Sequence, residues 1–84
     1  MWYVYFLRLS NQDIYVGITE DINKRFDQHS KGNVKSTKCY RPLSLCSYIA
    51  VPDKQKALEL ERYFKTGSGK AILKKRIISE KIIK

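Results

Sequence analysis

Two segments near the start of the chain have the apolar composition of β-strands. Residues 2–9, WYVYFLRL, are rich in β-branched and aromatic side chains, and residues 14–19, IYVGIT, place three β-branched side chains on one face. The polar turn SNQD lies between them, so the pattern predicts a β-hairpin. Gly17 lies on the opposite face of the second strand, which indicates either a close approach to the sheet there or a tolerated irregularity.

The segment after the hairpin has the spacing of an amphipathic helix. Thr19 or Asp21 can cap its start, and the pattern predicts a helix over about residues 22–31. Its apolar anchors are four residues apart: Ile22 and Phe26. Arg25 and His29, also four apart, lie on the flank of the apolar stripe. A guanidinium and an imidazole are therefore expected side by side at the edge of the core.

A basic, polar loop leads into a third predicted strand, residues 43–51, and then into a second amphipathic helix that begins at Pro52 and Asp53. Its apolar stripe consists of three residues at helical spacing: Ala57, Leu60 and Phe64. Glu61 falls inside this stripe and not on the solvated face. Burying an unpaired carboxylate costs several kcal/mol, so Glu61 requires a positively charged or hydrogen-bonding partner.

The remainder of the chain predicts short helical material. Ser68 is expected to cap a third helix over residues 69–75. The basic tail, residues 77–84, is expected to pack onto the same domain through its apolar side chains: Ile77, Ile78 and Ile82. The order β-β-α-β-α-α predicts a small α/β (α+β) fold, a three-stranded antiparallel sheet flanked by helices.

Composition and charge narrow the class of protein. The chain has 84 residues, enough for one domain, and no apolar run approaches the ~20 residues that span a membrane. The apolar start lacks a signal-peptide pattern, so a cytoplasmic protein is expected, with Cys39 and Cys46 as free thiols. Seventeen Lys and Arg residues against eight Asp and Glu give a net charge of +9. This excess predicts a polyanionic partner, unless it forms only a solvated basic surface.

Polar residues from three predicted elements gather at the core edge, and there the sequence resembles a known family. The stretches YVY (residues 3–5) and YVG (residues 15–17) match the two halves of the motif that names the GIY-YIG nuclease superfamily. INKRFDQHSKG is similar to its helix with an arginine and a histidine, and ALELERYFK to its glutamate-bearing helix. The basic stretch STKCYRPLSL resembles that of small standalone bacterial members, the UPF0213-like group. The resemblance covers nearly the whole chain and marks residues 1–76 as a GIY-YIG-like catalytic domain.

The resemblance implies a metal-dependent endonuclease that hydrolyses nucleic-acid phosphodiesters, with DNA favoured over RNA. The catalytic residues that it implies are five: Tyr5, Tyr15, Arg25, His29 and Glu61. One divalent metal, Mg²⁺ or Mn²⁺, is expected on Glu61, because such a cation can take one carboxylate, several waters and substrate phosphate as ligands. Arg25 can bind the scissile phosphate with two hydrogen bonds. Gly17 is expected to leave clearance for this site.

Several alternatives remain open at this point. The family favours a tyrosine as the general base, whereas the ordinary pKa of about 6.5 makes His29 an easier base. Arg25 and Glu61 could instead form only a salt bridge, and the protein could be a non-catalytic nucleic-acid-binding module. Four loop residues are predicted to contact the phosphate backbone: Lys35, Lys38, Tyr40 and Arg41. Selection by substrate structure or by a protein partner is expected, from a monomer or weak dimer.

Overall fold

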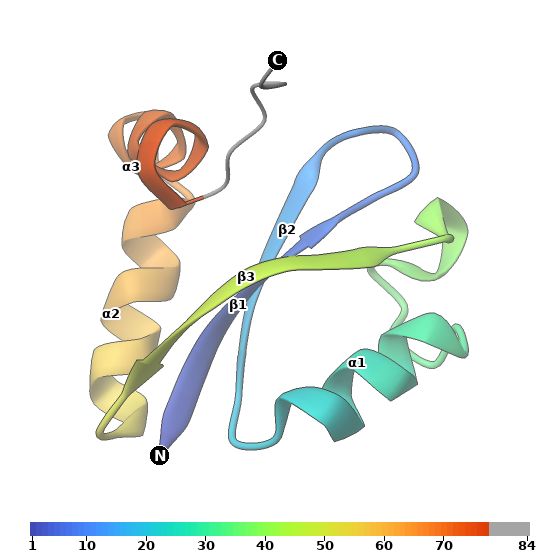
Figure 1. Ribbon diagram of the computed structural model, residues 1–84, viewed down its shortest axis with the longest axis horizontal. Coiled ribbons are helices and arrows are strands. Elements are labelled where there is room, and N and C mark those ends of the chain that lie inside the picture. Colours follow the sequence, from blue (N-terminus) through green and yellow to red (C-terminus); the bar gives the residue numbers. More distant parts are fainter. Residues whose placement is uncertain (78–84) are drawn as a thin grey trace.

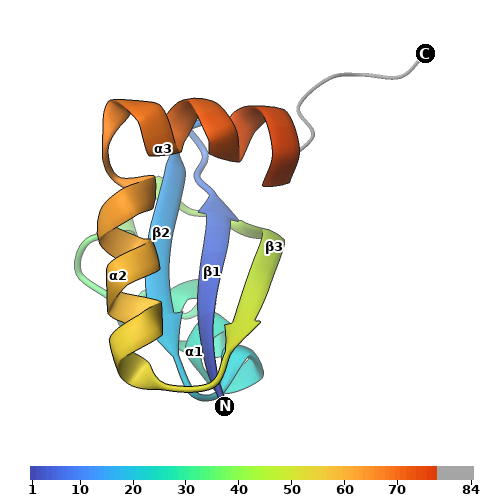
Figure 2. The ribbon, with the colours of Figure 1, turned by 90° about the vertical axis from the view of Figure 1, so that its left-hand side faces the viewer.

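The computed structural model describes residues 1–77, with side chains up to Lys75. Three antiparallel strands form one sheet in the order β2-β1-β3: β1 (Trp2–Arg8), β2 (Ile14–Thr19) and β3 (Ser44–Val51). Figure 2 shows this order, with β1 between the other two strands. The expected hairpin and the expected third strand are both confirmed.

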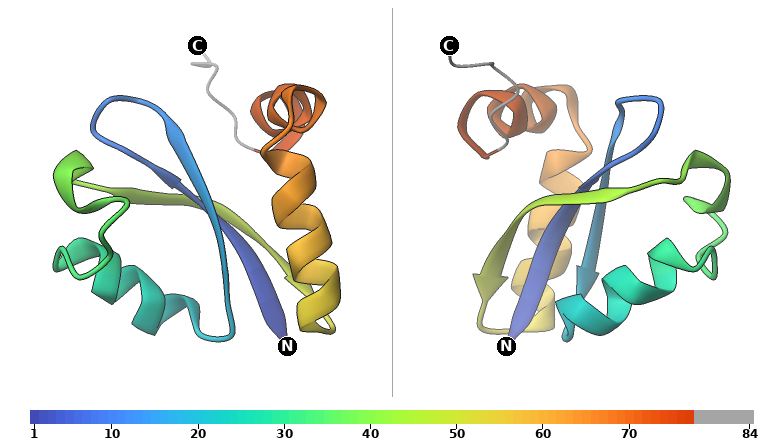
Figure 3. Two further views of the ribbon diagram at one scale, coloured as in Figure 1. Left: turned by 180° about the vertical axis from the view of Figure 1, so that it is seen from behind. Right: turned by 45° about the vertical axis from the view of Figure 1, so that its right-hand side comes forward.

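The helices follow in the predicted order. Helix α1 spans Ile22–Ser30, a short 3₁₀ turn spans Lys38–Tyr40, and α2 spans Lys54–Phe64. Helix α3 (Gly67–Ile72) continues into a π-helical segment, Leu73–Ile77. Helices α1 and α2 lie on opposite sides of the sheet (Figures 1 and 3). The α+β fold with the order β-β-α-β-α-α is therefore confirmed, and no helix in the described part of the chain is long and apolar enough to cross a membrane.

Aspartate side chains cap the two longer helices. Asp21 accepts a hydrogen bond from the backbone N–H of Lys24 at 3.0 Å, and Asp53 accepts one from Lys56 at 2.9 Å. Each cap satisfies a backbone donor that the first turn of a helix leaves unpaired. Thr19, the other candidate cap of α1, instead binds the backbone of Asp21 with its hydroxyl.

The prediction for the third helix was wrong at its start. The cap is Thr66, whose hydroxyl accepts a hydrogen bond from the N–H of Gly69 at 3.0 Å, and not Ser68. Thr66 has the extended backbone that a cap requires, whereas Ser68 already lies inside the helix. The predicted packing of Ile77, Ile78 and Ile82 lies outside the described side chains.

The two faces of the sheet have different chemistry. On one face Val4 and Phe6 pack against α2 with Ala57 and Phe64, and the rings of Phe6 and Phe64 meet edge to face at 5.2 Å. This face is the apolar core of the domain. The opposite face of β1 carries Tyr5 and looks toward α1. Successive strand residues point to opposite faces, so one strand supports both the core and the polar side.

Candidate active site

Gly17 lies under the ring of Tyr5. The two residues pair across β1 and β2, and both side-chain positions are on the face that looks toward α1. A Cβ atom built on Gly17 would lie 2.5 Å from Tyr5 Oη and 2.6 Å from Tyr5 Cζ. No side chain can occupy that space, so Gly17 is required for the phenol of Tyr5 to lie flat across β2. The close approach that Gly17 indicated is that of Tyr5 itself.

A buried chain of hydrogen bonds joins β1, α1 and the loop after α1. Tyr5 Oη lies 2.8 Å from His29 Nε2, and His29 Nδ1 lies 2.8 Å from Thr37 Oγ1. His29 and Thr37 are fully buried, and Tyr5 is only 3% exposed. These three side chains, called here the Tyr-His-Thr chain, hold the phenol in one position relative to α1.

Two further contacts set the direction of the protons in this chain. The Nε–H of Arg25 donates to Tyr5 Oη at 3.4 Å, and the hydroxyl of Thr37 donates to the carbonyl of Val34 at 3.5 Å. From these two contacts we infer that Tyr5 donates its own O–H to His29 Nε2 and that Thr37 accepts from the Nδ1–H of His29. This arrangement corresponds to a neutral imidazole protonated on Nδ1, with both nitrogens occupied.

Burial keeps both members of the Tyr5–His29 pair neutral. Burial is the largest cause that raises the pKa of Tyr5 above its usual 10.0; the hydrogen bond from Arg25 opposes it, and the charges of Tyr15 and Glu61 add to it. Burial also lowers the pKa of His29 to about 4, with a smaller effect from the positive charge of Arg25. A histidine with this pKa and no exposed nitrogen cannot itself take a proton from a water in the site.

Arg25 lies at the mouth of the site and is held in place by its own helix. Its Nη1 group donates to Gln28 Oε1 at 2.9 Å, while its Nε group reaches Tyr5. It also lines a cavity of about 400 Å³ beside Thr19 and Lys24, at the end of β2. The guanidinium is therefore fixed on one side and open to a ligand on the other.

Glu61 lies at the edge of the apolar stripe of α2, with its side chain 22% exposed. Its Oε2 atom pairs with Lys65 Nζ, one helical turn on, at 3.2 Å. The expected alternative of an ion pair between Glu61 and Arg25 is not formed in the described part of the chain. The carboxylate nevertheless lies close enough to Tyr5 to raise the pKa of that phenol. Glu61 is thus within electrostatic reach of Tyr5, although α2 lies on the other side of the sheet from α1.

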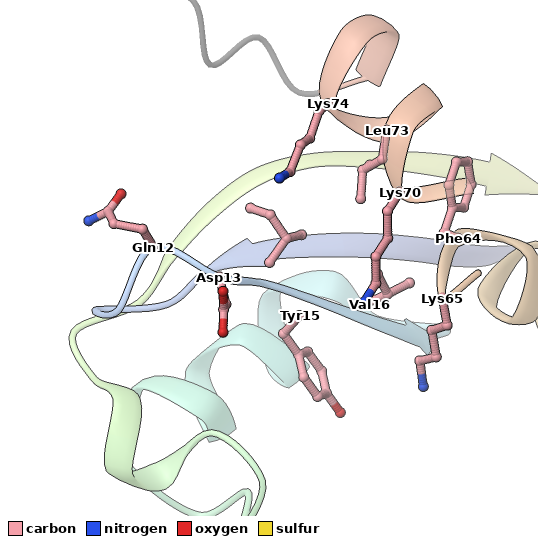
Figure 4. Close-up of a pocket in the computed structure, with 10 residues that line it drawn as sticks. Gln12, Asp13, Tyr15, Val16, Phe64, Lys65, Lys70, Leu73 and Lys74 are labelled. Atoms are coloured by element: carbon pink, nitrogen blue, oxygen red, sulfur yellow. The ribbon is translucent and has the colours of Figure 1, made fainter. Parts of the chain in front are cut away.

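Tyr15 is the partly exposed tyrosine of the site. Its ring lies 5.2 Å from the ring of His29 and 6.3 Å from that of Tyr5, both measured between centroids. It lines a cavity of about 550 Å³ between β2, the end of α2 and α3 (Figure 4). The four residues Tyr5, Tyr15, Arg25 and His29 are therefore brought together, with Glu61 beside them.

The four loop residues predicted to bind nucleic acid are exposed, but they line neither of these two cavities: Lys35, Lys38, Tyr40 and Arg41. Arg41 donates from Nε to the carbonyl of Lys38 at 3.0 Å and from Nη1 to that of Ser30 at 3.4 Å. It therefore stabilises the loop after α1. Cys39 and Cys46 are free thiols, as expected.

Sequence reasoning missed three residues that contact the site residues. Thr37 lies in a polar loop with no periodic pattern, so nothing in the sequence distinguished it from its neighbours. Gln28 could have been identified, because it follows Arg25 by three residues on the same helix. Lys65 could likewise have been found four residues after Glu61.

The donors present allow a metal site of one kind only. In residues 1–77 no group of three or more His, Cys, Asp or Glu side chains could hold a metal ion. An ion bound entirely by protein is therefore not supported by these side chains. A hard cation that keeps water and takes phosphate oxygen as further ligands fits the single carboxylate of Glu61.

Comparisons with known proteins identify the family. Residues 1–76 match the GIY-YIG catalytic domain. A UPF0213 protein of Cupriavidus pinatubonensis is 41% identical over 61 residues, which cover 71% of this chain and 68% of the relative. A UPF0213 protein of Vibrio cholerae is 44% identical over 62 residues, which cover 71% of this chain and 61% of the relative. The chain thus spans about two thirds of the length of these relatives. The solution NMR structure of a UPF0213 protein of Bacillus halodurans has a TM-score of 0.55 and 31% identity, over 87% of this chain and 82% of that one. The chain belongs to the GIY-YIG catalytic domain family, whose members are generally nucleases.

Proposed function

We propose that this chain is a metal-dependent endonuclease that hydrolyses phosphodiester bonds of nucleic acid, with DNA preferred over RNA. The single observation that carries the proposal is the contact of the buried Tyr5–His29 pair with Arg25, which lines an open cavity, with Glu61 acting on the same phenol by its charge. A guanidinium, two phenols and a carboxylate match the needs of phosphodiester hydrolysis, which are charge stabilisation and activation of water.

Arg25 binds the scissile phosphate in this proposal. Its charge is permanent, and its planar group can donate two parallel hydrogen bonds to phosphate oxygens. The bond to Gln28 and the contact with Tyr5 fix the side chain before substrate arrives. A fixed cation loses little conformational freedom on binding and so can stabilise the charge that develops at phosphorus.

The two tyrosines have separate tasks. Tyr15 is the phenol that borders open space, so we assign it to the attacking water as the general base or its orienting group. Tyr5 is buried, and its proton points to His29. Its raised pKa makes Tyr5 the poorer base, so it serves as a positioning residue for Arg25, and His29 positions Tyr5 in turn.

Glu61 would hold the metal, Mg²⁺ or Mn²⁺. When bound there, a divalent cation supplies charge stabilisation at phosphorus and on the leaving oxygen. Lys65 competes for the same carboxylate oxygen, at 3.2 Å. This exposed pair contributes little stability, so Lys65 can give up Glu61 at small cost.

Cleavage of a labelled panel of single-stranded, duplex, flapped and branched DNA and RNA tests the proposal, with Mg²⁺, Mn²⁺ or chelator present. Glu61→Gln is compared with Glu59→Gln, which makes the same change of charge on the same helix but on the solvated side, where Glu59 pairs with Lys56. We expect metal-dependent cutting by the wild type and by Glu59→Gln, and none by Glu61→Gln. Preference within the panel reports whether substrate structure directs the enzyme.

Two observations favour a second candidate function. The Glu61 carboxylate is paired with Lys65, and the described residues contain no cluster of metal ligands. A non-catalytic nucleic-acid-binding module would have this character. It would bind the panel in a salt-dependent manner, without cutting, and equally well with either glutamate variant. Cutting that persists in chelator would contradict the metal-dependent mechanism. A protein partner that supplies specificity, and a monomer or weak dimer, remain part of the proposal.

A further inference from the structure

The charged side chains that line the cavity beside Tyr15 are mostly positive, whereas nucleic acid is negatively charged. Three lysines line it, Lys65, Lys70 and Lys74, against one acidic side chain, Asp13. The Asp13 carboxylate already accepts a hydrogen bond from Asn11 Nδ2 at 3.2 Å. With a volume of about 550 Å³, the cavity has room for a phosphate group and part of its sugar. Its walls therefore attract an anion and can enclose one.

Two of these lysines come from one helical segment. Lys70 lies in α3, and Lys74 follows four residues later in the π-helical segment that continues it. Neither forms an ion pair with another described residue. Figure 4 shows the Lys70 side chain reaching from the helical segment toward β2, with the Lys74 side chain extending from the next turn and ending away from it. An anion bound in the cavity would give these two side chains a partner of opposite charge.

Glycine at one position holds this helix against its neighbour. A Cβ atom on Gly69 would collide with the carbonyl of Tyr63, so only glycine lets α3 begin directly against the end of α2. Leu73, 2% exposed, anchors the following turn in the core. Lys70 and Lys74 are thus carried by a segment that is fixed to the domain and not by a free tail.

Strand β2 connects this cavity to the candidate active site. Tyr15 and Lys65 line the cavity, and they contact the ring of His29 and the carboxylate of Glu61 respectively. At the other end of β2, Ile18 lines the second cavity together with Arg25. Between Ile14 and Ile18 a strand rises about 13 Å, so the two cavities lie at different points of one edge.

We propose that the cavity lined by Lys65, Lys70 and Lys74 is a second phosphate subsite, which binds an internal phosphodiester of the substrate strand away from the scissile one. The proposal rests on the proposed function for the position of the scissile phosphate at Arg25. A nucleic-acid strand then runs along the edge of β2, from Arg25 past Tyr15 to the lysines. The subsite fixes the path of the strand but takes no part in the chemical step.

Binding measured in chelator, where no cutting is expected, tests the subsite. Affinity for a labelled single-stranded oligonucleotide is determined as a function of salt for the wild type, for Lys70→Ala/Lys74→Ala, and for Lys56→Ala/Lys75→Ala. The control pair removes the same charge, and Lys75 is the exposed neighbour of Lys74 outside the cavity. The subsite neutralises one phosphate, and each such contact with a single strand contributes ~0.7 to the slope of log K against log salt. We therefore expect the magnitude of this negative slope to decrease by about 0.7 for the cavity pair and to stay unchanged for the control.

Single methylphosphonate replacements along the strand locate the contact. A neutral methylphosphonate at one internal position should weaken binding to the wild type but not to Lys70→Ala/Lys74→Ala, because the variant no longer contacts that phosphate. A methylphosphonate at a different position should weaken binding to the wild type but not to Arg25→Gln. Equal losses for the cavity and control pairs, sensitivity to a terminal phosphate alone, or a single position for both variants would overturn the proposal. The two proposals fail in different assays. If the nuclease function is wrong, the cleavage panel shows no cutting while the lysine contact can still be mapped by binding in chelator; if the subsite is wrong, the binding assay shows no such contact.

Discussion

The single histidine of the chain offers a direct test of the buried site. His29 is the only histidine in the sequence, so one imidazole signal reports on it without ambiguity. Its pKa is lowered to about 4 from an ordinary 6.5, because the ring is buried and lies near the charge of Arg25. We expect a histidine that remains neutral from pH 8 down to about pH 5, with its proton on Nδ1.

The sign and size of the effect on stability follow from this shift. Between pH 6.5 and pH 4 the unfolded chain binds a proton at this imidazole that the folded chain does not bind. The free energy of unfolding therefore falls as the pH decreases through this window. One pKa unit corresponds to about 1.36 kcal/mol. The titration of His29 therefore lowers the free energy of unfolding by about 2 kcal/mol at pH 5 and by about 3 kcal/mol at pH 4, relative to neutral pH. Above pH 6.5 it has no effect.

Two measurements check this prediction. A proton and ¹⁵N NMR titration gives the pKa and the tautomer of His29, and urea denaturation between pH 7.5 and pH 4.5 gives the stability. The same denaturation series on His29→Gln, which has no imidazole to titrate, separates this contribution from that of the carboxylates. A measured pKa near 6.5, or a proton on Nε2, would refute the proton arrangement deduced for the Tyr-His-Thr chain.

Three further predictions concern the residues around this ring. Gly17→Ala places a Cβ against the phenol of Tyr5, so urea denaturation should detect a loss of about 1–3 kcal/mol, and an unchanged stability would contradict the packing. Thr37→Val leaves the buried Nδ1–H of His29 without an acceptor and should lower the free energy of unfolding by about 1–3 kcal/mol, whereas Thr37→Ser keeps that hydrogen bond. Identical NMR signals of the imidazole in the two variants would argue against a hydrogen bond between His29 and Thr37. Tyr15→Phe should leave the melting temperature nearly unchanged but lower the cleavage rate by about 10²-fold or more, while Tyr5→Phe should lower both; a Tyr15→Phe enzyme with normal kcat would exclude this tyrosine as the base.

Much of the fold was accessible from the sequence because local patterns agreed with it. The apolar composition of β1, the two faces of β2, the aspartate caps, and the helical spacing of Ala57 and Phe64 all agree with the final structure. The misplaced cap of α3 arose because Thr66 and Ser68 are both good cap residues. Only the backbone conformation at Thr66 decides between them.

The candidate site was less accessible, because its contacts join segments far apart in the chain. The pairing of Tyr5 with His29 spans 24 residues, and the bond from His29 to Thr37 depends on the path of an irregular loop. Helical spacing placed Arg25 and His29 together on α1, yet it could not tell that His29 would be fully buried while Arg25 stays open. Periodicity assigns a residue to a face, whereas burial depends on what covers that face.

The burial of the Tyr-His-Thr chain favours positioning as its purpose over stability. Replacing water by protein partners gains little net free energy for each hydrogen bond, and apolar side chains of similar volume could fill this space equally well. What an apolar cluster could not supply is one fixed orientation of a phenol oxygen that accepts from Arg25. Tyr5 lies between a buried imidazole and an open guanidinium, so displacing His29 or Thr37 should be felt at Arg25. A site that must hold a cation against a mobile phosphate strand benefits from such support more than from added core.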